Sequence, residues 1–356
     1  MFKTKVCFLT SFLATALICS PLLGQTVNPY QSRNQHFGVS GGNANDIGHA
    51  FCCGGTLGSL LTDGATQYIL SNNHILARSD QAAPGEDISQ PGLIDNGCRP
   101  ATIVADYTAA PPLGSNVDAA IAQLIPGQMD STGFIEGIGT ISSTVAAPAV
   151  GLAVIKSGRT TGTTTGSIAT INASVKVQYQ VGCFEGKKFF VNYTNQMLIN
   201  RTNFSAGGDS GSLIVSNDTN FNPVALLYAG SSSATAANPI GEVLTKVGTA
   251  LGKSVSFVGG GGGGRGNGKP NAGSNRILGL PDQAVEHAKR VLEQNRHDLM
   301  SKPAVLGVGL GAADDANSQA AIVVYVDKTN SNRPQLPDQI DSVRVKVVLT
   351  DPFIAF

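Results

Sequence analysis

The chain has 356 residues, more than one ordinary domain needs, and this length predicts two or three hydrophobic cores. Its 24 basic and 24 acidic residues balance, which argues against a nucleic-acid-binding protein because such proteins use an excess of Lys and Arg. The apolar fraction of 42% excludes a globally disordered chain. With 43 Gly and no Trp, the composition indicates a β-rich, turn-rich secreted protein rather than a helical bundle.

The first 24 residues have the pattern of a secretory signal peptide. Lys3 and Lys5 precede an apolar stretch over residues 6–19, and no further charge follows until Arg33. We therefore expect an exported protein, either periplasmic or secreted. An uncleaved anchor is the alternative, because the apolar stretch and the residues that follow it are just long enough to span a bilayer.

Removal of the signal peptide leaves four cysteines: Cys52, Cys53, Cys98 and Cys183. An even number in an exported protein predicts two disulfides, for which three connectivities are open. A bond between the adjacent Cys52 and Cys53 would be strained, so we expect each of them to pair with a distant cysteine. A zinc site is the rival interpretation, and the spacings match no common zinc pattern.

The next part of the chain predicts a polar lead-in over residues 25–50, without a core of its own, and then many short strands. Their lengths and the turns between them favour antiparallel barrels or sandwiches. A helix is predicted over residues 239–251, where apolar residues fall on one face. The expected strands are residues 56–61, 68–71, 119–124, 152–156, 167–171, 175–181, 189–193, 212–215 and 224–229.

A Gly-rich linker over residues 259–275 separates this region from the tail. Its string Gly263-xxxx-Gly268-Lys269 resembles a phosphate-binding loop, but Pro270 stands where a Ser or Thr would hold magnesium, so we reject that interpretation. The tail, residues 276–356, predicts a small α+β domain. It has an amphipathic helix over residues 281–300 and strands over residues 305–310, 320–326 and 343–349.

The sharpest chemical signal is the string Phe-Ser-Ala-Gly-Gly-Asp-Ser-Gly-Ser-Leu over residues 204–213. A nucleophilic serine needs an exposed hydroxyl and backbone N–H groups aimed at the oxyanion that forms during its attack. The glycines around Ser210 allow the backbone to turn so that the Gly208 and Ser210 amides converge. A polar hairpin turn is the alternative interpretation of this string alone.

His74 follows an apolar strand over residues 68–71, a setting that suits a positioned general base. Asp118 stands just before another apolar strand and could orient His74, with Asp106 as the second candidate. Ordinary structural roles are the alternative for each residue taken alone. The remaining histidines lie in the lead-in or on the tail helix: His36, His49, His287 and His297.

The order His74, Asp118, Ser210 is that of chymotrypsin-like proteases and differs from the orders in subtilisins and α/β-hydrolases. Together with several flanking motifs, it resembles the trypsin/chymotrypsin-like serine proteases. The resemblance is closer to the bacterial and plant branch that includes the narrow-leaf-type peptidases. It spans residues 51–258, and its motifs are residues 55–58, 70–74, 90–92, 117–122, 156–162, 204–212 and 238–240.

This resemblance implies a mainly β, chymotrypsin-like fold of two six-stranded β-barrels, with the active site in the cleft between them. It also implies that Phe204 lies at the base of the primary substrate pocket and that the strand leading to Gly230 forms a wall. Since Phe204 is not an acid, we expect an apolar or small substrate side chain rather than Lys or Arg. Two departures from the family are Ile75, where a cysteine is common, and Gly207, where the closer branch often has Pro.

The sequence therefore predicts an exported serine endopeptidase that acts through an acyl-enzyme on Ser210, with His74 as general base. A catalytically weak or inactive binding protein with a protease fold is the alternative, and an esterase on the same fold is another. We expect no cofactor and no metal. The expected partner is a protein or peptide substrate, not nucleic acid, together with an intramolecular contact from the C-terminal domain.

Overall fold

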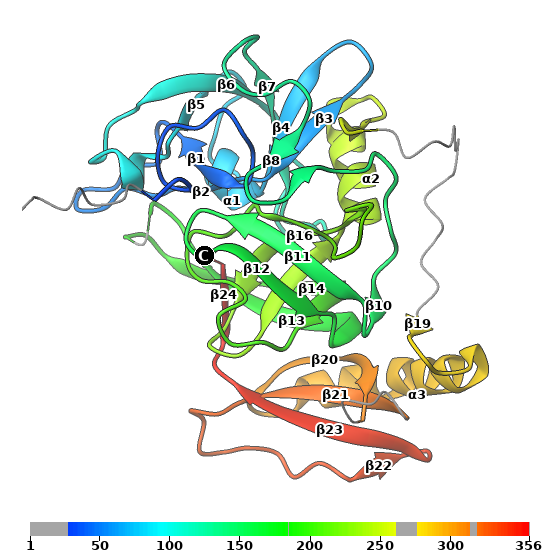
Figure 1. Cartoon of the computed structure of the whole chain (residues 1–356). Coiled ribbons are helices and arrows are strands. Elements are labelled where there is room, and N and C mark those ends of the chain that lie inside the picture. Colours follow the sequence, from blue (N-terminus) through cyan, green and yellow to red (C-terminus); the bar gives the residue numbers. More distant parts are fainter. Residues whose placement is uncertain (1–27, 184, 261–275, 314–318, 356) are drawn as a thin grey trace, which may run out of the picture.

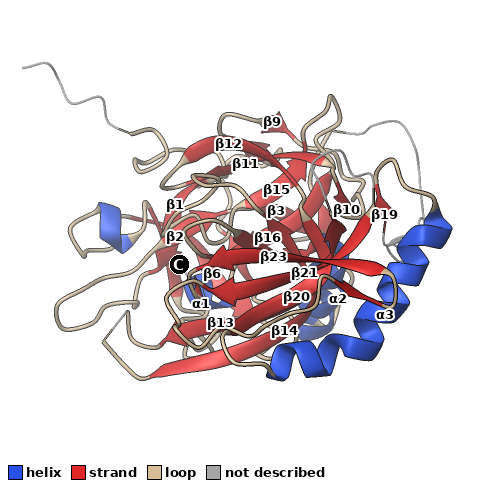
Figure 2. Ribbon diagram, turned by 90° about the horizontal axis from the view of Figure 1, so that it is seen from below, coloured by secondary structure: helices blue, strands red, loops and turns tan. Residues whose placement is uncertain are grey.

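The computed structural model describes residues 28–183, 185–260, 276–313 and 319–355. These residues form a mainly β structure with few helices (Figures 1 and 2). The predicted signal peptide lies outside the described residues, as does the Gly-rich string that resembles a phosphate-binding loop. Among the described residues, no helix has the length and apolar character needed to cross a membrane.

The first sheet contains eight described strands, and its neighbouring strands are antiparallel. The pairing of Ser71 with Ala120 places the end of one strand beside the start of another. His74 follows Ser71 and Asp118 precedes Ala120, so this register brings both residues to the same end of the sheet. The spatial order is β18 (Ser256–Phe257), β3 (Ser59–Thr62), β4 (Gln67–Ser71), β7 (Ala120–Leu124), β6 (Thr102–Ala109), β5 (Asp87–Gln90), β1 (Val39–Asn43) and β2 (Gly55–Leu57).

The second sheet is longer and runs on into the C-terminal part of the chain. Its spatial order is β12 (Gly162–Ser167), β11 (Ala153–Gly158), β15 (Leu213–Ser216), β16 (Pro223–Gly230), β17 (Thr235–Pro239), β14 (Lys188–Ile199), β13 (Thr170–Gln180), β20 (Val305–Ala312), β21 (Ala320–Asp327), β23 (Val343–Thr350) and β22 (Gln339–Ile340), with β24 (Phe353–Ala355) paired to β13 and β16. The two sheets are consistent with a double β-barrel, which confirms the predicted fold class.

The remaining elements are short or helical. They are the strands β8 (Phe134–Ile135), β9 (Gly139–Thr140), β10 (Ala149–Val150) and β19 (Arg276–Ile277), and the helices α1 (Asn73–Leu76), η1 (Leu93–Asp95), α2 (Ile240–Leu251) and α3 (Asp282–Ser301). Helix α2 packs its apolar face on the core of the first sheet, and the chain then adds β18 to that sheet. This return explains part of the excess over the six strands that the resemblance implies.

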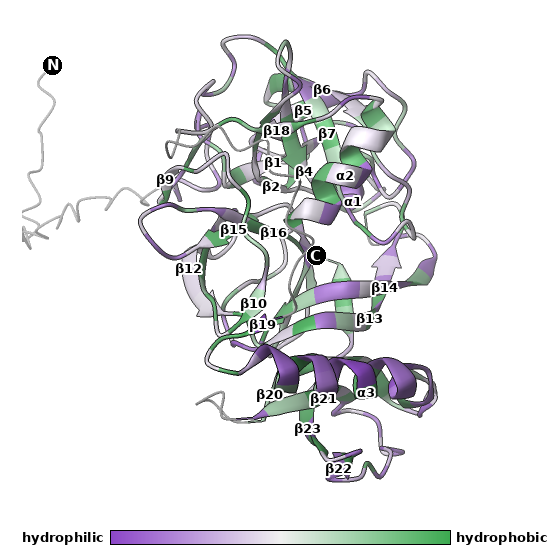
Figure 3. Cartoon of the chain, turned by 90° about the vertical axis from the view of Figure 1, so that its right-hand side faces the viewer, coloured by the Kyte–Doolittle hydropathy of each residue, from purple (hydrophilic) through white to green (hydrophobic). Residues whose placement is uncertain are grey.

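The C-terminal strands continue the second sheet, because β20 pairs antiparallel with β13. Helix α3 contacts β20 and β21, and its polar residues face away from them (Figure 3). The buried residues of α3 and β20 belong to the same hydrophobic cluster as residues of the second barrel. The two parts of the chain that the predicted boundary separates therefore share one hydrophobic core.

Two stretches differ from the sequence expectations. The lead-in contributes β1 to the first sheet, and Phe37 and Val39 are fully buried. The sequence gives no apolar run here, because these two residues alternate with small residues. The two strands expected at residues 167–171 and 175–181 overlap one long strand, β13. Asn172, with φ of +49°, lies where the register of β13 shifts, and this irregularity hides the continuity of the strand.

Candidate active site

His74 lies on α1, the single helical turn that follows β4. Its main-chain N–H donates to Asp118 Oδ1 at 3.2 Å, and its ring Nδ1 lies 2.6 Å from Asp118 Oδ2. These two bonds fix both the backbone and the imidazole relative to one carboxylate. Since Nδ1 faces the acceptor-only carboxylate, Nδ1 carries the proton in this bond and Nε2 is the other ring nitrogen.

Asp118 is completely buried, and its main chain is held from two sides. The Asn72 side-chain amide donates to the Asp118 carbonyl at 2.6 Å, while the Asp118 N–H donates to Asn238 Oδ1 at 3.0 Å. Asn238 in turn donates to Gln196 Oε1 at 2.6 Å. Both asparagines belong to motifs quoted in the sequence analysis, and their structural purpose is to fix the position of the carboxylate.

Tyr179 is a site residue that the sequence analysis did not identify. Its hydroxyl donates to Asp118 Oδ2 at 2.8 Å and lies 2.7 Å from the Tyr193 hydroxyl. Because the one Tyr179 proton goes to the carboxylate, the Tyr193 hydroxyl must be the donor between the two tyrosines. Burial raises the pKa of Tyr179 well above 10, and the Asp118 charge raises it further, so this donor stays protonated at physiological pH.

The segment before Ser210 forms a tight turn in which the Asp209 N–H donates to the Ala206 carbonyl at 3.0 Å. Gly208 occupies the third position with φ of +96°, a conformation that glycine adopts without strain. The Gly207 carbonyl accepts a bond of 2.6 Å from Thr160 Oγ1. The carbonyl and N–H of one trans peptide point in opposite directions, so this bond orients the Gly208 N–H away from Thr160.

The same reasoning applies to the peptide that joins Asp209 to Ser210. The Asp209 carbonyl accepts the Ser212 N–H at 3.0 Å and the Ser212 hydroxyl at 2.6 Å. The Ser210 N–H is therefore directed away from Ser212. Local hydrogen bonds thus fix the orientation of both amides that the sequence analysis singled out.

A buried ion pair between Asp209 and Lys156 holds this turn in place. The fully buried Asp209 carboxylate accepts two Thr main-chain N–H groups and lies 3.4 Å from Lys156 Nζ, which is also fully buried. Lys156 also donates to Thr161 Oγ1 and to the Gly162 carbonyl. Burial lowers the pKa of Lys156, and the Asp209 charge opposes that shift. The motif at residues 156–162 contained Lys156, but its pairing with Asp209 could not be read from the sequence.

Ser210 lies where the two sheets meet. Its carbonyl accepts the Thr56 N–H of β2 at 2.8 Å, which ties the turn to the first barrel. Gly55 packs against this carbonyl and against Ile75, the residue after His74. A Cβ at Gly55 would lie within 3 Å of both. The side chain is buried, and its hydroxyl donates to the Tyr228 carbonyl at 3.1 Å.

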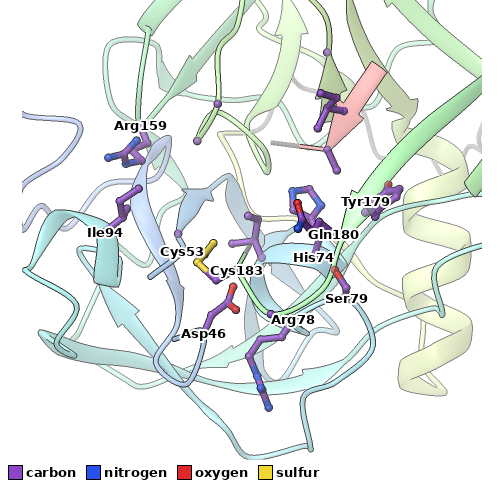
Figure 4. A pocket seen from close by; sticks show the side chains of 18 of the residues that line it. Asp46, Cys53, His74, Arg78, Ser79, Ile94, Arg159, Tyr179, Gln180 and Cys183 are labelled. Carbon is purple, nitrogen blue, oxygen red and sulfur yellow. A yellow bond between two sulfur atoms is a disulfide. The ribbon is translucent and has the colours of Figure 1, made fainter. Parts of the chain in front are cut away.

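A cavity of about 610 Å³ adjoins these residues (Figure 4). Its wall includes His74, Tyr179 and Gly208, together with the disulfide between Cys53 and Cys183. Other lining residues are Asp46, Arg78, Arg159, Gly207, Gly230, Ile354 and Ala355. Burial raises the pKa of Asp46 to about 6, although the charges of Arg78 and His74 oppose the shift.

The remaining sequence candidates fall in different places. Gly230 lines the cavity. The Phe204 side chain is fully buried in the core of the second barrel, next to Gly166. Asp106, the second candidate for the orienting acid, lies on β6 opposite Asp87, whereas Asp118 bonds to His74.

The cysteines pair as Cys52–Cys98 and Cys53–Cys183. Each of the two adjacent cysteines thus bonds to a distant one, which confirms that expectation and resolves the three open connectivities. Two disulfides are compatible with an exported protein. No group of three or more His, Cys, Asp or Glu that could hold a metal ion occurs in the part of the chain that the structure describes.

No protein-family model matches the sequence, and no curated protein does. Among solved structures, a glutamic acid-specific serine protease that uses a histidine triad in substrate binding is 20% identical, over 62% of this chain and 98% of its own, with a TM-score of 0.42. Thermobifida fusca Protease A is 19% identical, over 60% and 98%, with a TM-score of 0.40. Cellulomonas bogoriensis chymotrypsin is 16% identical, over 64% and 99%, with a TM-score of 0.41. These neighbours are chymotrypsin-like serine proteases at low sequence identity.

Proposed function

We propose that the chain is an exported serine endopeptidase that forms an acyl-enzyme on Ser210, with His74 as general base and Asp118 as the group that orients it. The observation that carries this proposal is the bond of 2.6 Å between His74 Nδ1 and Asp118 Oδ2, on the wall of a cavity that the turn before Ser210 also lines. A general base held by a buried carboxylate next to a serine is the arrangement that activates a hydroxyl for attack.

The reaction begins when the Ser210 side chain rotates from the Tyr228 carbonyl toward His74. His74 Nε2 takes the hydroxyl proton as Ser210 Oγ bonds to the carbonyl carbon of the substrate, and the Gly208 and Ser210 N–H groups bind the resulting oxyanion. The carbon–nitrogen bond then breaks, and the imidazolium gives its proton to the leaving amine. Water, deprotonated by His74, hydrolyses the ester and releases Ser210.

We also propose that the chain belongs to the narrow-leaf-type branch, is exported and prefers an apolar or small substrate side chain. Membership of the narrow-leaf-type branch rests on the sequence motifs, and export rests on the pattern of the first 24 residues together with the disulfides. A preference for an apolar or small substrate side chain rests on the resemblance alone, which implies that Phe204 lies at the base of the primary pocket; the side chain itself is fully buried in the core of the second barrel. The proposed substrate is a protein or peptide.

The test is covalent labelling and casein hydrolysis by the wild type, Ser210→Ala and the control Ser131→Ala, which changes an exposed serine. A fluorophosphonate should label the wild type and the control, and Ser210→Ala should abolish labelling and lower turnover by about 10⁴-fold or more. Unchanged casein hydrolysis in Ser210→Ala would refute the proposal. Labelling without hydrolysis of any protein substrate would favour an esterase instead.

An inactive binding protein is the second candidate, and one observation favours it: the Ser210 hydroxyl is bonded to the Tyr228 carbonyl. A serine that kept this bond permanently could not transfer its proton to His74. Absence of labelling in the wild type under conditions where the protein is folded would support this candidate.

A further inference from the structure

The last described strand of the chain, β24, lies in the candidate active site. It pairs antiparallel with the end of β16 and parallel with β13, so that Ile354 lies opposite both Gly230 and Gln178. Ile354 and Ala355 of this strand, and Asp351 just before it, line the same cavity as His74. In Figure 4 the pale red ribbon of the C-terminal strand stands beside His74.

This position exists because β15 leaves part of β16 uncovered. The paired residues end at Leu213 opposite Leu226, and the main chains of Gly211 and Ser212 add hydrogen bonds to Leu227 before the chain turns into the Ser210 loop. The edge of β16 at Ala229 and Gly230 therefore has no β15 partner, and β24 takes that place. An uncovered strand edge is a template on which an extended peptide binds through its main chain.

The same edge leads directly to the proposed nucleophile. Tyr228 immediately precedes Ala229, and its carbonyl accepts the Ser210 hydroxyl at 3.1 Å. A peptide extended along Ala229 and Gly230 thus passes within reach of Ser210 and His74. Strand β24 therefore occupies the stretch of β16 that follows the residue bonded to Ser210, and it lines the same cavity as His74.

We propose that β24 is an intramolecular occupant of the edge of β16 at Ala229 and Gly230, and that it blocks the path of a peptide substrate to Ser210. The chain is then self-inhibited, and a substrate binds only when β24 leaves the edge. This inference rests on the proposed function, because it concerns the regulation of the same site.

The contacts of β24 suit a segment that is held but can be released. Phe353 is buried, with its ring centroid 5.9 Å from that of Tyr325, and Thr350 at the end of β23, just before β24, has its hydroxyl 2.5 Å from Ser231 Oγ. In contrast, the strand has only three residues, and Ile354 is 42% exposed. Opening a strand of only three residues costs much less than unfolding the molecule.

The first experiment compares casein hydrolysis by the full chain, Ile354→Pro and the matched control Ile354→Ala. Pro removes the main-chain N–H and disrupts pairing with the neighbouring strands, whereas Ala keeps the N–H and only shortens a side chain of the cavity wall. If β24 blocks the path of the substrate, Ile354→Pro should raise kcat/KM by about tenfold or more, mainly through a lower KM, and Ile354→Ala, which keeps the main-chain N–H, should raise it much less. Equal kcat/KM in all three proteins, with Ser210 labelling intact, would overturn the inference.

The second experiment does not depend on catalysis or on the folding of the Pro variant. Hydrogen exchange is followed in full-length Ser210→Ala with a millimolar synthetic peptide of the sequence of residues 350–356, and with a scrambled peptide as control. Displacement of β24 should accelerate amide exchange in residues 353–355 with the matching peptide alone. Unchanged exchange with the matching peptide would overturn the inference, whereas loss of Ser210 labelling in the wild type would count against the proposed function.

Discussion

The buried carboxylate of Asp118 is stabilised by three donors: the His74 ring, the His74 main chain and the Tyr179 hydroxyl. Without such donors, a fully buried carboxylate would be strongly unfavourable. The Tyr179 hydroxyl bonds to Asp118 and Tyr193, so its role is to position Asp118 and to share its charge. The Tyr193 hydroxyl orients Tyr179 in the same way, one step further from His74.

We therefore predict that Tyr179→Phe lowers kcat roughly ten- to a hundredfold and leaves KM nearly unchanged, because a hydrogen bond to a buried charge is worth about 1.5–3 kcal/mol. Tyr193→Phe is the matched control, since it removes a buried hydroxyl that does not contact Asp118. Steady-state kinetics on casein-derived peptides measures both effects. An equal loss in the two variants, or a change confined to KM, would contradict a positioning role for Tyr179.

The Asp46 carboxyl group lines the same cavity as His74, and folding changes its pKa. Burial raises its pKa from 3.8 to about 6. Between about pH 4 and pH 6 the folded state therefore binds more protons at Asp46 than the unfolded state does, and the free energy of unfolding falls as the pH rises.

We predict that Asp46→Asn removes this fall, because Asn stays neutral. The free energy of unfolding of the variant, relative to the wild type, should increase between pH 4 and pH 7 by up to ~3 kcal/mol. Urea unfolding of both proteins at several pH values measures the difference, which cancels the contributions of the other carboxylates. A difference that is independent of pH would show that Asp46 ionises normally in the folded state.

At the scale of elements, the sequence predicts most of the strands that carry the site. The helix expected at residues 239–251 is observed as α2 (Ile240–Leu251), and the helix expected at residues 281–300 is observed as α3 (Asp282–Ser301). These segments were predictable because each has a strong period or a clear capping residue, which are local properties. The β24 strand was not, since three residues provide no period.

The site itself was predictable to the extent that its residues stand in motifs. His74, Asp118 and Ser210 each follow or precede an apolar strand, so their places at strand ends could be inferred. Tyr179 gave no signal, because it lies within an ordinary alternating strand and meets Asp118 only through the tertiary fold. Lys156 is similar: a buried lysine cannot be distinguished from an exposed one without knowledge of its partner.

The disulfide between Cys53 and Cys183 shows how distant elements complete the cavity. It joins the loop before β2 to the turn between β13 and β14, which are 130 residues apart in the chain. Closing so long a loop restricts the unfolded chain strongly, and the cross-link also brings the β13–β14 hairpin of the second barrel against the first barrel. The cavity wall therefore has contributions from both barrels as well as from β24.

At the scale of the whole molecule, the C-terminal part is not an independent module in its packing. Strand β20 extends the second sheet, and Leu310 on β20 lies opposite Ile171 on β13. Leu310, Ile171 and the buried face of α3 share one hydrophobic cluster with the second barrel. Separating the two parts would expose this cluster, so their stabilities should be coupled.

We accordingly predict that the full chain unfolds in one cooperative calorimetric transition, with equal calorimetric and van't Hoff enthalpies. Leu310→Ala should lower the free energy of unfolding by about 2–5 kcal/mol, because Leu310 is fully buried, and it should shift the whole transition to lower temperature. The matched control Leu349→Ala changes a leucine that is 48% exposed on β23 and should shift it far less. Two separate transitions, of which Leu310→Ala moves only one, would mean that the barrels and the C-terminal strands unfold independently despite their shared core.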